Sequence, residues 1–292
     1  MTELKFISIE PITKGWSEDK KYCVIKEDGT KCLLRISPIE RYETRKTMFS
    51  MLEKVSQLEI PMCKPLEFDT CKDGVYTLYS WIDGKDAEDV IPFLPKKQQY
   101  ALGVKSGEIL RRIHSIKAPA NQEDWYTRFN RKANTKIQKY KECPLHFEGD
   151  YKLIEYIENN RELLKNRPQC FQHGDYHIGN MMIENNELVI IDFDRFDFGD
   201  GWEEFNRIVW CAQASPYFAT GQLNGYFGGE PPIEFFKLLA LYIASNTLSS
   251  IYWAIPFGQS DVDTMMKQAN DVLDWYDKME NCIPSWYLTY IK

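Results

Sequence analysis

The sequence predicts an α+β protein with a small β-rich N-terminal lobe at residues 1–82 and a larger, mainly helical C-terminal lobe at residues 83–292. Two observations lead to this fold class. Before residue 82, short apolar runs that alternate with polar residues are separated by turn residues, as in strands joined by hairpins. Beyond Asp83-Gly84-Lys85, apolar residues recur instead at the spacing of one helix face. We therefore place the boundary between the lobes after Ile82.

The N-terminal lobe contains short strands and one helix. We expect strands in the runs Leu4–Ile9, Tyr22–Ile25, Lys31–Ile36, Leu66–Phe68 and Val75–Trp81. The dipeptide Asp28-Gly29 between two of these runs is a strong hairpin signal, because glycine adopts the positive φ that a tight turn needs. The spacing of apolar residues over Ile39–Val55 predicts a helix.

The C-terminal lobe is predicted from segments with helical periodicity. We expect helices at Tyr100–Ile116, Trp125–Tyr140, Tyr151–Leu164, Trp202–Ala214, Ile233–Tyr252 and Val262–Met279. Pro231-Pro232 precedes one of them, at a position where a helix tolerates proline.

Composition narrows the class of protein. The net charge of −7 argues against a nucleic-acid partner, since neutralising phosphates requires a basic face. The eight cysteines are scattered, without a C-x-x-C pair, and the N-terminus carries no secretory signal, so free thiols in the cytoplasm are expected. Apolar stretches are interrupted or too short to span a bilayer. We expect a cytoplasmic monomer without a membrane partner.

The stretch Phe171–Gly201 carries the densest set of chemically active side chains. Asp175 and Asn180 stand in a D-x-x-x-x-N spacing, and Asp192 follows the apolar run Leu188–Ile191, where a buried strand should end. A carboxylate base, a carboxamide and a strand-end carboxylate are what metal-assisted phosphoryl transfer requires. Asp175 is the candidate catalytic base, while Asn180 and Asp192 are candidate Mg²⁺ ligands, because Mg²⁺ prefers hard oxygen donors.

These motifs carry a family resemblance. His173-Gly174-Asp175, with Asn180 and then Ile191-Asp192-Phe193-Asp194, resembles the aminoglycoside phosphotransferase family, which is related to choline kinases and more distantly to protein kinases. The resemblance implies a protein-kinase-like two-lobe fold that transfers the γ-phosphate of ATP or GTP, with Mg²⁺, to a hydroxyl of a small molecule. It suggests an aminoglycoside, and hence antibiotic resistance, while choline and sugars are acceptors elsewhere in the wider group.

The resemblance also implies nucleotide contacts in the N-terminal lobe. Arg35 lies within an apolar strand run, where a kinase-like strand presents a cation to phosphates; an ordinary edge-strand arginine is the alternative. Ser17, in the first hairpin, is a candidate phosphate contact although no G-x-G-x-x-G is present. The backbone of Ser80 and Ile82 would face the base.

One departure from the family pattern concerns the partner of Arg35. Kinase-like folds pair the strand cation with a glutamate on the following helix, but Met48 stands about where that residue is expected. Glu43 and Glu53 are the nearest acids. This departure leaves a catalytically silent nucleotide-binding module as the alternative function.

Acidic residues after the second motif are candidates for binding a cationic acceptor. We assign this role to Asp194, Asp197, Glu204 and Glu230. The alternative is a solvated loop and first helical turn, where carboxylates suit the positive end of a helix.

Two hydrolase classes are also considered. His173-x-Asp175-x-His177 has metal-ligand spacing, but a zinc or iron site would need distant carboxylates as well. A serine or cysteine hydrolase is disfavoured because no G-x-S-x-G is present.

Overall fold

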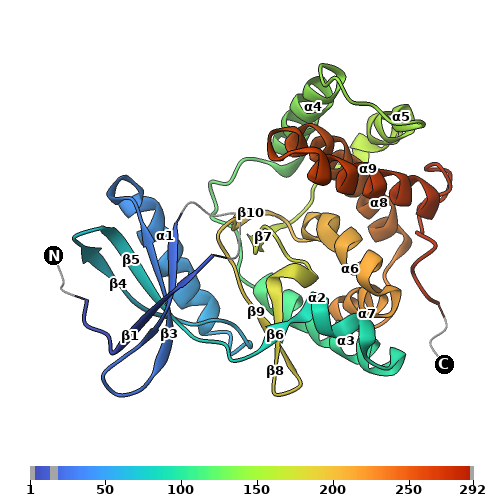
Figure 1. Cartoon of the computed structure of the whole chain (residues 1–292). Coiled ribbons are helices and arrows are strands. Elements are labelled where there is room, and N and C mark those ends of the chain that lie inside the picture. The colour runs from blue at the N-terminus through green and yellow to red at the C-terminus, as the bar shows by residue number, and fades with distance from the viewer. Residues whose placement is uncertain (1–3, 14–18, 290–292) are drawn as a thin grey trace. The chain divides into compact units, whose positions relative to one another are not determined.

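The computed structural model describes residues 4–13 and 19–289, and the chain forms two compact units (Figure 1). Unit 1 comprises Met1–Ala87 and Asn180–Asp194, and unit 2 comprises Glu88–Gly179 and Arg195–Lys292. This division differs from the single boundary expected after residue 82, because a short hairpin from the middle of the chain belongs with the N-terminal strands.

Unit 1 is built on an antiparallel five-stranded sheet with the strand order β1-β2-β3-β5-β4. Its strands are β1 (Ser8–Ile12), β2 (Lys20–Ile25), β3 (Lys31–Ser37), β4 (Pro65–Cys71) and β5 (Gly74–Ser80). The predicted turn at Asp28-Gly29 joins β2 to β3, with Gly29 at φ 84° and the Thr30 amide donating to Asp28 Oδ1 at 2.8 Å. The first strand begins four residues later than the alternation indicates.

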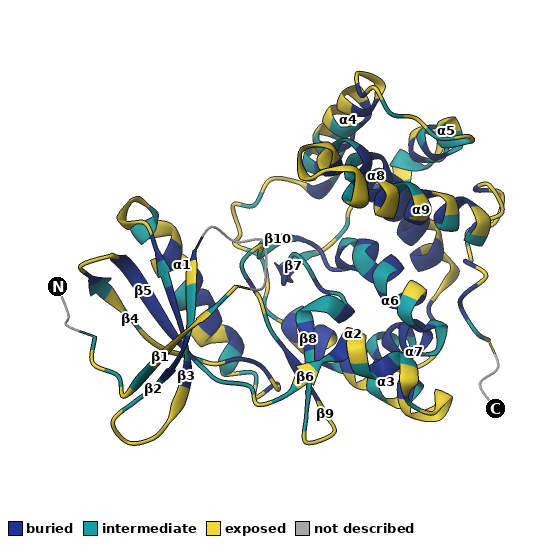
Figure 2. Cartoon of the chain, in the orientation of Figure 1, coloured by how far each residue is buried: buried dark blue, intermediate teal, exposed yellow. Residues whose placement is uncertain are grey.

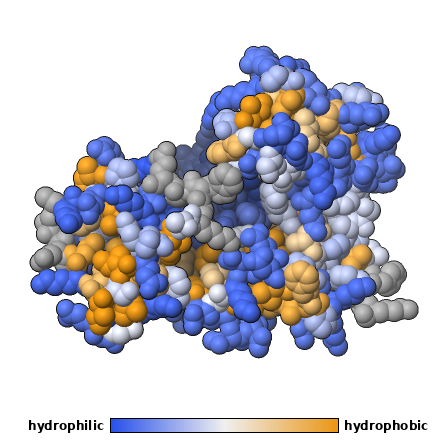
Figure 3. Space-filling model, viewed as in Figure 1, coloured by the Kyte–Doolittle hydropathy of each residue, from blue (hydrophilic) through white to orange (hydrophobic). Residues whose placement is uncertain are grey.

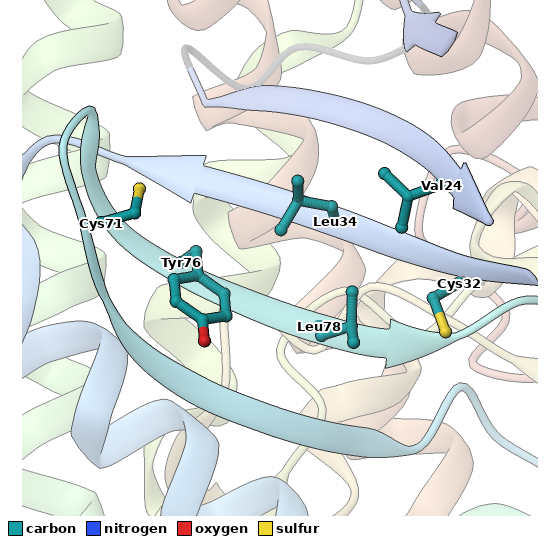
Figure 4. Close-up of a cluster of buried hydrophobic side chains, with 6 residues drawn as sticks. All are labelled: Val24, Cys32, Leu34, Cys71, Tyr76 and Leu78. Atoms are coloured by element: carbon teal, nitrogen blue, oxygen red, sulfur yellow. The ribbon is translucent and has the colours of Figure 1, made fainter. Parts of the chain in front are cut away.

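Side chains alternate along each strand, so the two faces of this sheet carry different sets of residues. One face carries the hydrophobic cluster of Figure 4, made of Val24, Cys32, Leu34, Cys71, Tyr76 and Leu78. The opposite face carries Arg35, paired across the strands with Thr77, and Thr77 in turn with Phe68. Helix α1 packs on this second face.

Helix α1 (Tyr42–Ser56) follows the single turn η1 (Ile39–Arg41), so the predicted helix is present. It packs through the rings of Phe49 and Phe68, whose centroids lie 5.5 Å apart. Figure 3 shows apolar side chains at the surface over part of unit 1. Ile7, Ile9 and Leu66 are exposed apolar residues of this unit.

A second, three-stranded sheet completes unit 1. It contains β6 (Lys85–Asp86), β8 (Met181–Glu184) and β9 (Glu187–Ile190) in the order β6-β8-β9. Asn185 and Asn186 form the turn of the β8–β9 hairpin at positive φ, which asparagine tolerates.

Unit 2 is mainly helical, with one two-stranded sheet of β7 (Gln169–Gln172) and β10 (Asp197–Asp200). Its longer helices are α3 (Lys96–Ile113), α4 (Trp125–Lys141), α5 (Asp150–Asn160), α6 (Ile208–Ala214), α7 (Pro216–Phe227), α8 (Ile233–Ala254) and α9 (Gln259–Trp275). Shorter helical turns are α2 (Ala87–Val90), η2 (Ile91–Phe93), η3 (Arg161–Leu164), η4 (Ile178–Asn180), η5 (Glu203–Arg207) and η6 (Ile255–Phe257).

Helix α7 is absent from the sequence expectations, and glycine explains why. Gly221 and Gly225 lower its intrinsic helix propensity. They are used for close packing, because a Cβ on Gly221 would lie 2.3 Å from the carbonyl oxygen of Tyr100, and one on Gly103 would lie 2.2 Å from that of Phe218. Helices α3 and α7 therefore meet backbone to backbone.

Helix α8 forms the centre of unit 2 and is dark blue along most of its length in Figure 2. In the described part of the chain, one segment, Ile233–Phe257, is apolar and long enough to cross a membrane; 72% of its most apolar window is buried. It is a core helix of this fold. The α+β class and the order of β-rich and helical parts are as the sequence predicts.

Candidate active site

Asp175 lies on a loop that leaves β7 and is fixed by its neighbours on both sides. Gly174 has φ 86°, and a Cβ there would lie 1.8 Å from the Arg195 carbonyl oxygen, so only glycine fits. The Gly174 amide donates to the two carboxylate oxygens of Glu204, at 2.9 and 3.3 Å. His173, which is fully buried, accepts from the Asp175 amide at Nδ1.

The other side of the loop is anchored by Tyr176. Its hydroxyl donates to the Ser106 carbonyl oxygen at 2.8 Å, and Gln222 Nε2 donates to Ser106 Oγ at 2.8 Å. The close α3–α7 packing thus holds the loop, because Ser106 lies on α3 and Gln222 on α7. Asp175 is placed between two fixed residues.

Three cationic or ionisable side chains face the Asp175 carboxylate within unit 2. Arg207 Nε lies 3.4 Å and His177 Nε2 3.6 Å from Oδ1, and Arg195 Nη1 lies 3.8 Å from Oδ2. Nδ1 of His177 accepts from the Gly179 amide, which places the proton of the neutral ring on Nε2, toward Asp175. Burial raises the pKa of Asp175, but His177, Arg207 and Arg195 outweigh it and hold this pKa well below its usual range.

Within unit 1, Asn180 and Asp192 flank the open end of the β8–β9 hairpin. The Ile191 amide donates to the Asn180 carbonyl oxygen at 3.1 Å, which brings the two backbones together. Asp192 is exposed at φ 63°, a left-handed conformation that is uncommon for a residue other than glycine and is concentrated at functional sites. A carboxamide and an exposed carboxylate on adjoining strand ends are oxygen donors of the kind and number that Mg²⁺ uses, so these residues fit the ion.

Arg35 belongs to a charged cluster on the second face of the sheet, made of Asp19, Arg35, Arg45 and Asp194, with Arg41 Nη1 at its edge, 3.5 Å from Asp19 Oδ1. Arg35 Nε donates to Asp19 Oδ2 at 2.5 Å, and its Nη2 pairs with Asp194. Arg45 pairs with the same Asp19 oxygen, lies 3.3 Å from Asp194 Oδ1 and donates to Ser37 Oγ at 2.9 Å. Burial would raise the pKa of Asp19, yet the arginines lower it below its usual value.

This cluster answers the question of the partner of Arg35. The carboxylates come from Asp19, before β2, and from Asp194, after the hairpin, while the helix contributes a cation, Arg45, which also contacts Met48 Sδ at 3.3 Å. Neither Glu43 nor Glu53, both exposed on α1, takes part in these contacts. Sequence reasoning missed Arg45 and Asp19 because it looked for an acid on the helix; an arginine one helical turn before Met48 was the available signal.

The remaining predicted nucleotide contacts lie elsewhere in unit 1. Ser17 lies outside the described residues. The Ser80 amide donates to the Lys64 carbonyl oxygen at 2.9 Å, and the Lys64 amide donates to Ser80 Oγ, so these two groups of Ser80 are already used. Ile82 is half-buried in the connector between β5 and β6.

The four acidic residues assigned to the acceptor have different surroundings. Asp194 is paired with the two arginines of unit 1, and Asp197 with Arg128 of α4. Glu204 is only 2% exposed and holds the Gly174 amide, which gives it a positioning role in place of the predicted substrate contact. Glu230 alone of these four is exposed.

The described residues contain no cluster of ligands for a metal-dependent hydrolase. Within residues 4–13 and 19–289, no three His, Cys, Asp or Glu side chains lie close enough together to hold a metal ion. A hollow of about 440 Å³ in unit 1, over the Tyr76 and Leu78 side of the sheet, contains none of the predicted site residues.

Comparison with known proteins gives a family and a fold. A sequence model of the APH phosphotransferase enzyme family matches residues 8–236, more than half of the chain. No curated protein matches the sequence significantly.

Solved structures of small-molecule kinases share the fold. A choline/ethanolamine kinase family protein from Mesorhizobium loti is 15% identical with a TM-score of 0.67, covering 94% of this chain and 91% of that one. The aminoglycoside phosphotransferase APH(4)-Ia, as a thermostable mutant with ADP and hygromycin B, is 13% identical with a TM-score of 0.66, covering 92% and 94%. An amicoumacin kinase with AMP-PNP and Ca²⁺ is 13% identical with a TM-score of 0.65, covering 94% and 90%. At such identities the likeness concerns the fold alone, and it confirms the predicted kinase-like fold class.

Proposed function

Because this chain belongs to the phosphotransferase enzyme family, we propose that it transfers the γ-phosphate of ATP or GTP to a hydroxyl group of a small molecule. The observation that carries the proposal is Asp175: an ionised carboxylate on a loop fixed from both sides by Glu204 and Ser106. Kinases of this family use ATP with a divalent cation, and two of the structural neighbours hold ADP or AMP-PNP.

Asp175 accepts the hydrogen bond of the acceptor hydroxyl and orients its oxygen toward the γ-phosphorus. The new O–P bond forms as the bond to the bridging oxygen of the β-phosphate breaks, and that oxygen keeps the electron pair. The hydroxyl proton passes to Asp175 and then to solvent. Since the pKa of Asp175 is low, it is a weak base, which suits a loose transition state in which the proton leaves late.

When bound, Mg²⁺ would supply positive charge beside the transferring phosphoryl group and the leaving diphosphate. Asn180 and Asp192 are the residues proposed to hold it. Their oxygen donors and the unusual backbone of Asp192 support this assignment.

Donor contacts are proposed for residues of unit 1. Arg35 is proposed to face the donor phosphates, together with Arg45. Ser17 remains a proposed phosphate contact. Ser80 and Ile82 are proposed to contact the base. These contacts are proposed to determine whether ATP or GTP is the donor, and the panel assay below compares the two nucleotides.

The acceptor defines the finer function. An aminoglycoside, with antibiotic resistance as its consequence, is one candidate, and choline or a sugar is another. We propose that the reaction takes place in the cytoplasm on a monomer, without a nucleic-acid or membrane partner.

The alternative of a silent nucleotide-binding module was motivated by the missing helix glutamate. Two carboxylates form ion pairs with Arg35, so the missing helix glutamate is weaker support for this alternative. Binding of nucleotide without turnover on any acceptor is the result that would favour the module.

A panel assay tests the proposal. The full chain is incubated with MgATP or MgGTP and with aminoglycosides, choline and sugars, and transfer of the labelled γ-phosphate is measured. We expect transfer that depends on Mg²⁺ and is lost in Asp175→Asn. Transfer that persists in Asp175→Asn would show that Asp175 is not the catalytic base.

A further inference from the structure

The charge around Asp175 is unbalanced within unit 2. Arg207 and Arg195 each approach one carboxylate oxygen, at 3.4 and 3.8 Å, and His177 approaches as well. In the part of the chain that the structure describes, Asp175 is the carboxylate with which either arginine forms an ion pair. Two permanent cations thus share one anion with a third, ionisable group.

The nearby acids of unit 2 are engaged elsewhere. Glu204 is buried beneath Gly174, and Glu203 accepts from Gln172 Nε2 at 3.0 Å. Asp200 is held by Arg167 at 2.7 and 3.0 Å, and Asp197 is paired with Arg128. Glu88 is the exception: its carboxylate lies beside Gly179, where the His177 ring also lies, and it offsets part of the positive charge of the cluster there.

Helix α4 carries a lysine that Arg207 influences. Lys136 is half-buried, and burial, the largest cause, lowers its pKa to about 8, while Glu203 opposes this shift more strongly than either Lys132 or Arg207 adds to it. The positive charge that a cationic ligand would meet at Asp175 is therefore that of Arg195 and Arg207.

We infer that the acceptor of the proposed reaction carries an anionic group, a carboxylate or phosphate, beside its reacting hydroxyl, and that Arg195 and Arg207 bind this group. The inference rests on the proposed function and selects among its acceptors. Arg195 suits such contacts because its side chain is 53% exposed and only loosely paired with Asp175. Guanidinium groups bind carboxylate and phosphate through two parallel hydrogen bonds.

The donor's own γ-phosphate is the other possible source of the anion. The residues proposed for donor and metal, Arg35, Asn180 and Asp192, all belong to unit 1, whereas Arg195 and Arg207 belong to unit 2 with the base. We therefore assign the two arginines to the acceptor, and the experiment separates the two sources.

The test uses acceptors that differ mainly in charge: glucuronate, glucose and glucosamine, with glycerate, glycerol, choline and the polycation kanamycin. Transfer from MgATP gives kcat and KM for each, and calorimetry in the presence of MgAMP-PNP gives binding independently of turnover. We expect the anion to exceed its neutral counterpart by about tenfold in kcat/KM or in affinity, the gain of one charge-assisted contact.

Variants of the full chain locate the effect. Arg195→Gln and Arg207→Gln should each raise the KM of the anionic acceptor by about tenfold, while Arg195→Lys retains part of the binding. Arg195→Glu should move the preference toward glucosamine. Lys139→Gln, on the exposed side of α4, is the matched control and should leave the preference unchanged.

Each contrary result has a distinct meaning. Preferred use of kanamycin or choline, with no rise in KM in the arginine variants, overturns the inference and leaves the kinase function intact. If the arginine variants raise the KM for nucleotide and lower MgATP hydrolysis by water to the same extent with every acceptor, the arginines act on the donor. This result also overturns the inference. Failure to bind nucleotide at all contradicts the proposed function itself.

Discussion

The two charged clusters of this protein differ in how far their charges are buried. In unit 1, Asp19 and Asp194 face Arg35 and Arg45, and the side chains of Asp19 and both of these arginines are less than a tenth exposed, while the partly exposed Arg41 adds a third cation 3.5 Å from Asp19. In unit 2, Asp175 alone faces Arg195 and Arg207, and Arg195 is more than half exposed.

The comparison indicates different tasks. Each buried charge of a closed cluster needs its partner, because an unpaired member would be left in a medium of low polarity. An open cluster can keep an excess of one sign, because water screens it until a ligand arrives. Besides the proposed contact of Arg35 with the donor phosphates, the unit 1 cluster should therefore contribute strongly to folding stability, whereas the unit 2 cluster should act mainly on activity.

The largest expected effect is on activity at the open cluster. Asp175→Asn keeps the shape of the side chain but removes the charge that orients and accepts the proton, so we expect kcat to fall about 10²–10⁴-fold. Nucleotide binding, measured by calorimetry, should persist. Asp197→Asn, which removes a carboxylate paired with Arg128 in the same unit, is the control and should change kcat by less than about threefold.

The closed cluster should respond in stability. Asp19→Asn leaves Arg35 and Arg45 buried with one carboxylate fewer, so we expect a loss of about 3–5 kcal/mol in the free energy of unfolding. Denaturant unfolding at neutral pH measures it. Glu53→Gln on the exposed side of α1 should change stability little, and equal losses in the two variants would contradict the comparison.

The effect of Asp19→Asn should also depend on pH. The folded-state pKa of Asp19 lies below its usual value, so its charge stabilises the fold above that usual value. This contribution is lost as the pH falls through the lower, folded-state pKa. The stability difference between the variant and the wild type should therefore be constant near neutrality and shrink only in strong acid.

Much of the fold could be predicted from the sequence because the signals were local. Alternation and the Asp28-Gly29 turn predicted the strands of the five-stranded sheet, with the first strand placed four residues too early, and helical spacing predicted most helices of unit 2. Helix α7 was missed because its glycines serve a partner far away in sequence, α3. The paired G-x-x-x-G spacings at Gly103–Gly107 and Gly221–Gly225 were a usable signal.

For the candidate site, the sequence indicated residues whose spacing along the chain is fixed by one loop and one hairpin. Asp175, Asn180 and Asp192 are of this kind and remain the proposed machinery. Asp19 and Arg207 could not be found, because their partners depend on the fold, whereas Arg45 was missed although it lies one helical turn before Met48. Glu204 was assigned to substrate because the sequence did not show that it is buried.

A smaller effect is expected from removing one cation of the open cluster. Arg207→Gln takes away a group that lowers the pKa of Asp175, so that pKa should rise and Asp175 should be protonated at a higher pH. Activity depends on the ionised form, so the acid limb of the kcat/KM profile should move upward in pH. A limb that stays in place would show that another group controls it.

The smallest expected effect is a gain of stability at the edge of the open cluster. Burial is the main cause that lowers the folded-state pKa of Lys136 to about 8, against 10.5 ordinarily; Lys132 and Arg207 add to the shift and Glu203 opposes it, so the charged form of this lysine disfavours folding. Lys136→Met removes the charge and keeps the length, and we expect about 1 kcal/mol of added stability, or a Tm higher by about 2–4 °C at pH 7. Below pH 8 the full gain should be present, and it should fade as the pH rises from 8 to above 10.5, where the wild-type lysine is neutral in the unfolded chain as well. Lys139→Met, exposed on the same helix, should give no such pH-dependent gain; if it does, the burial of Lys136 is not what destabilises the folded state.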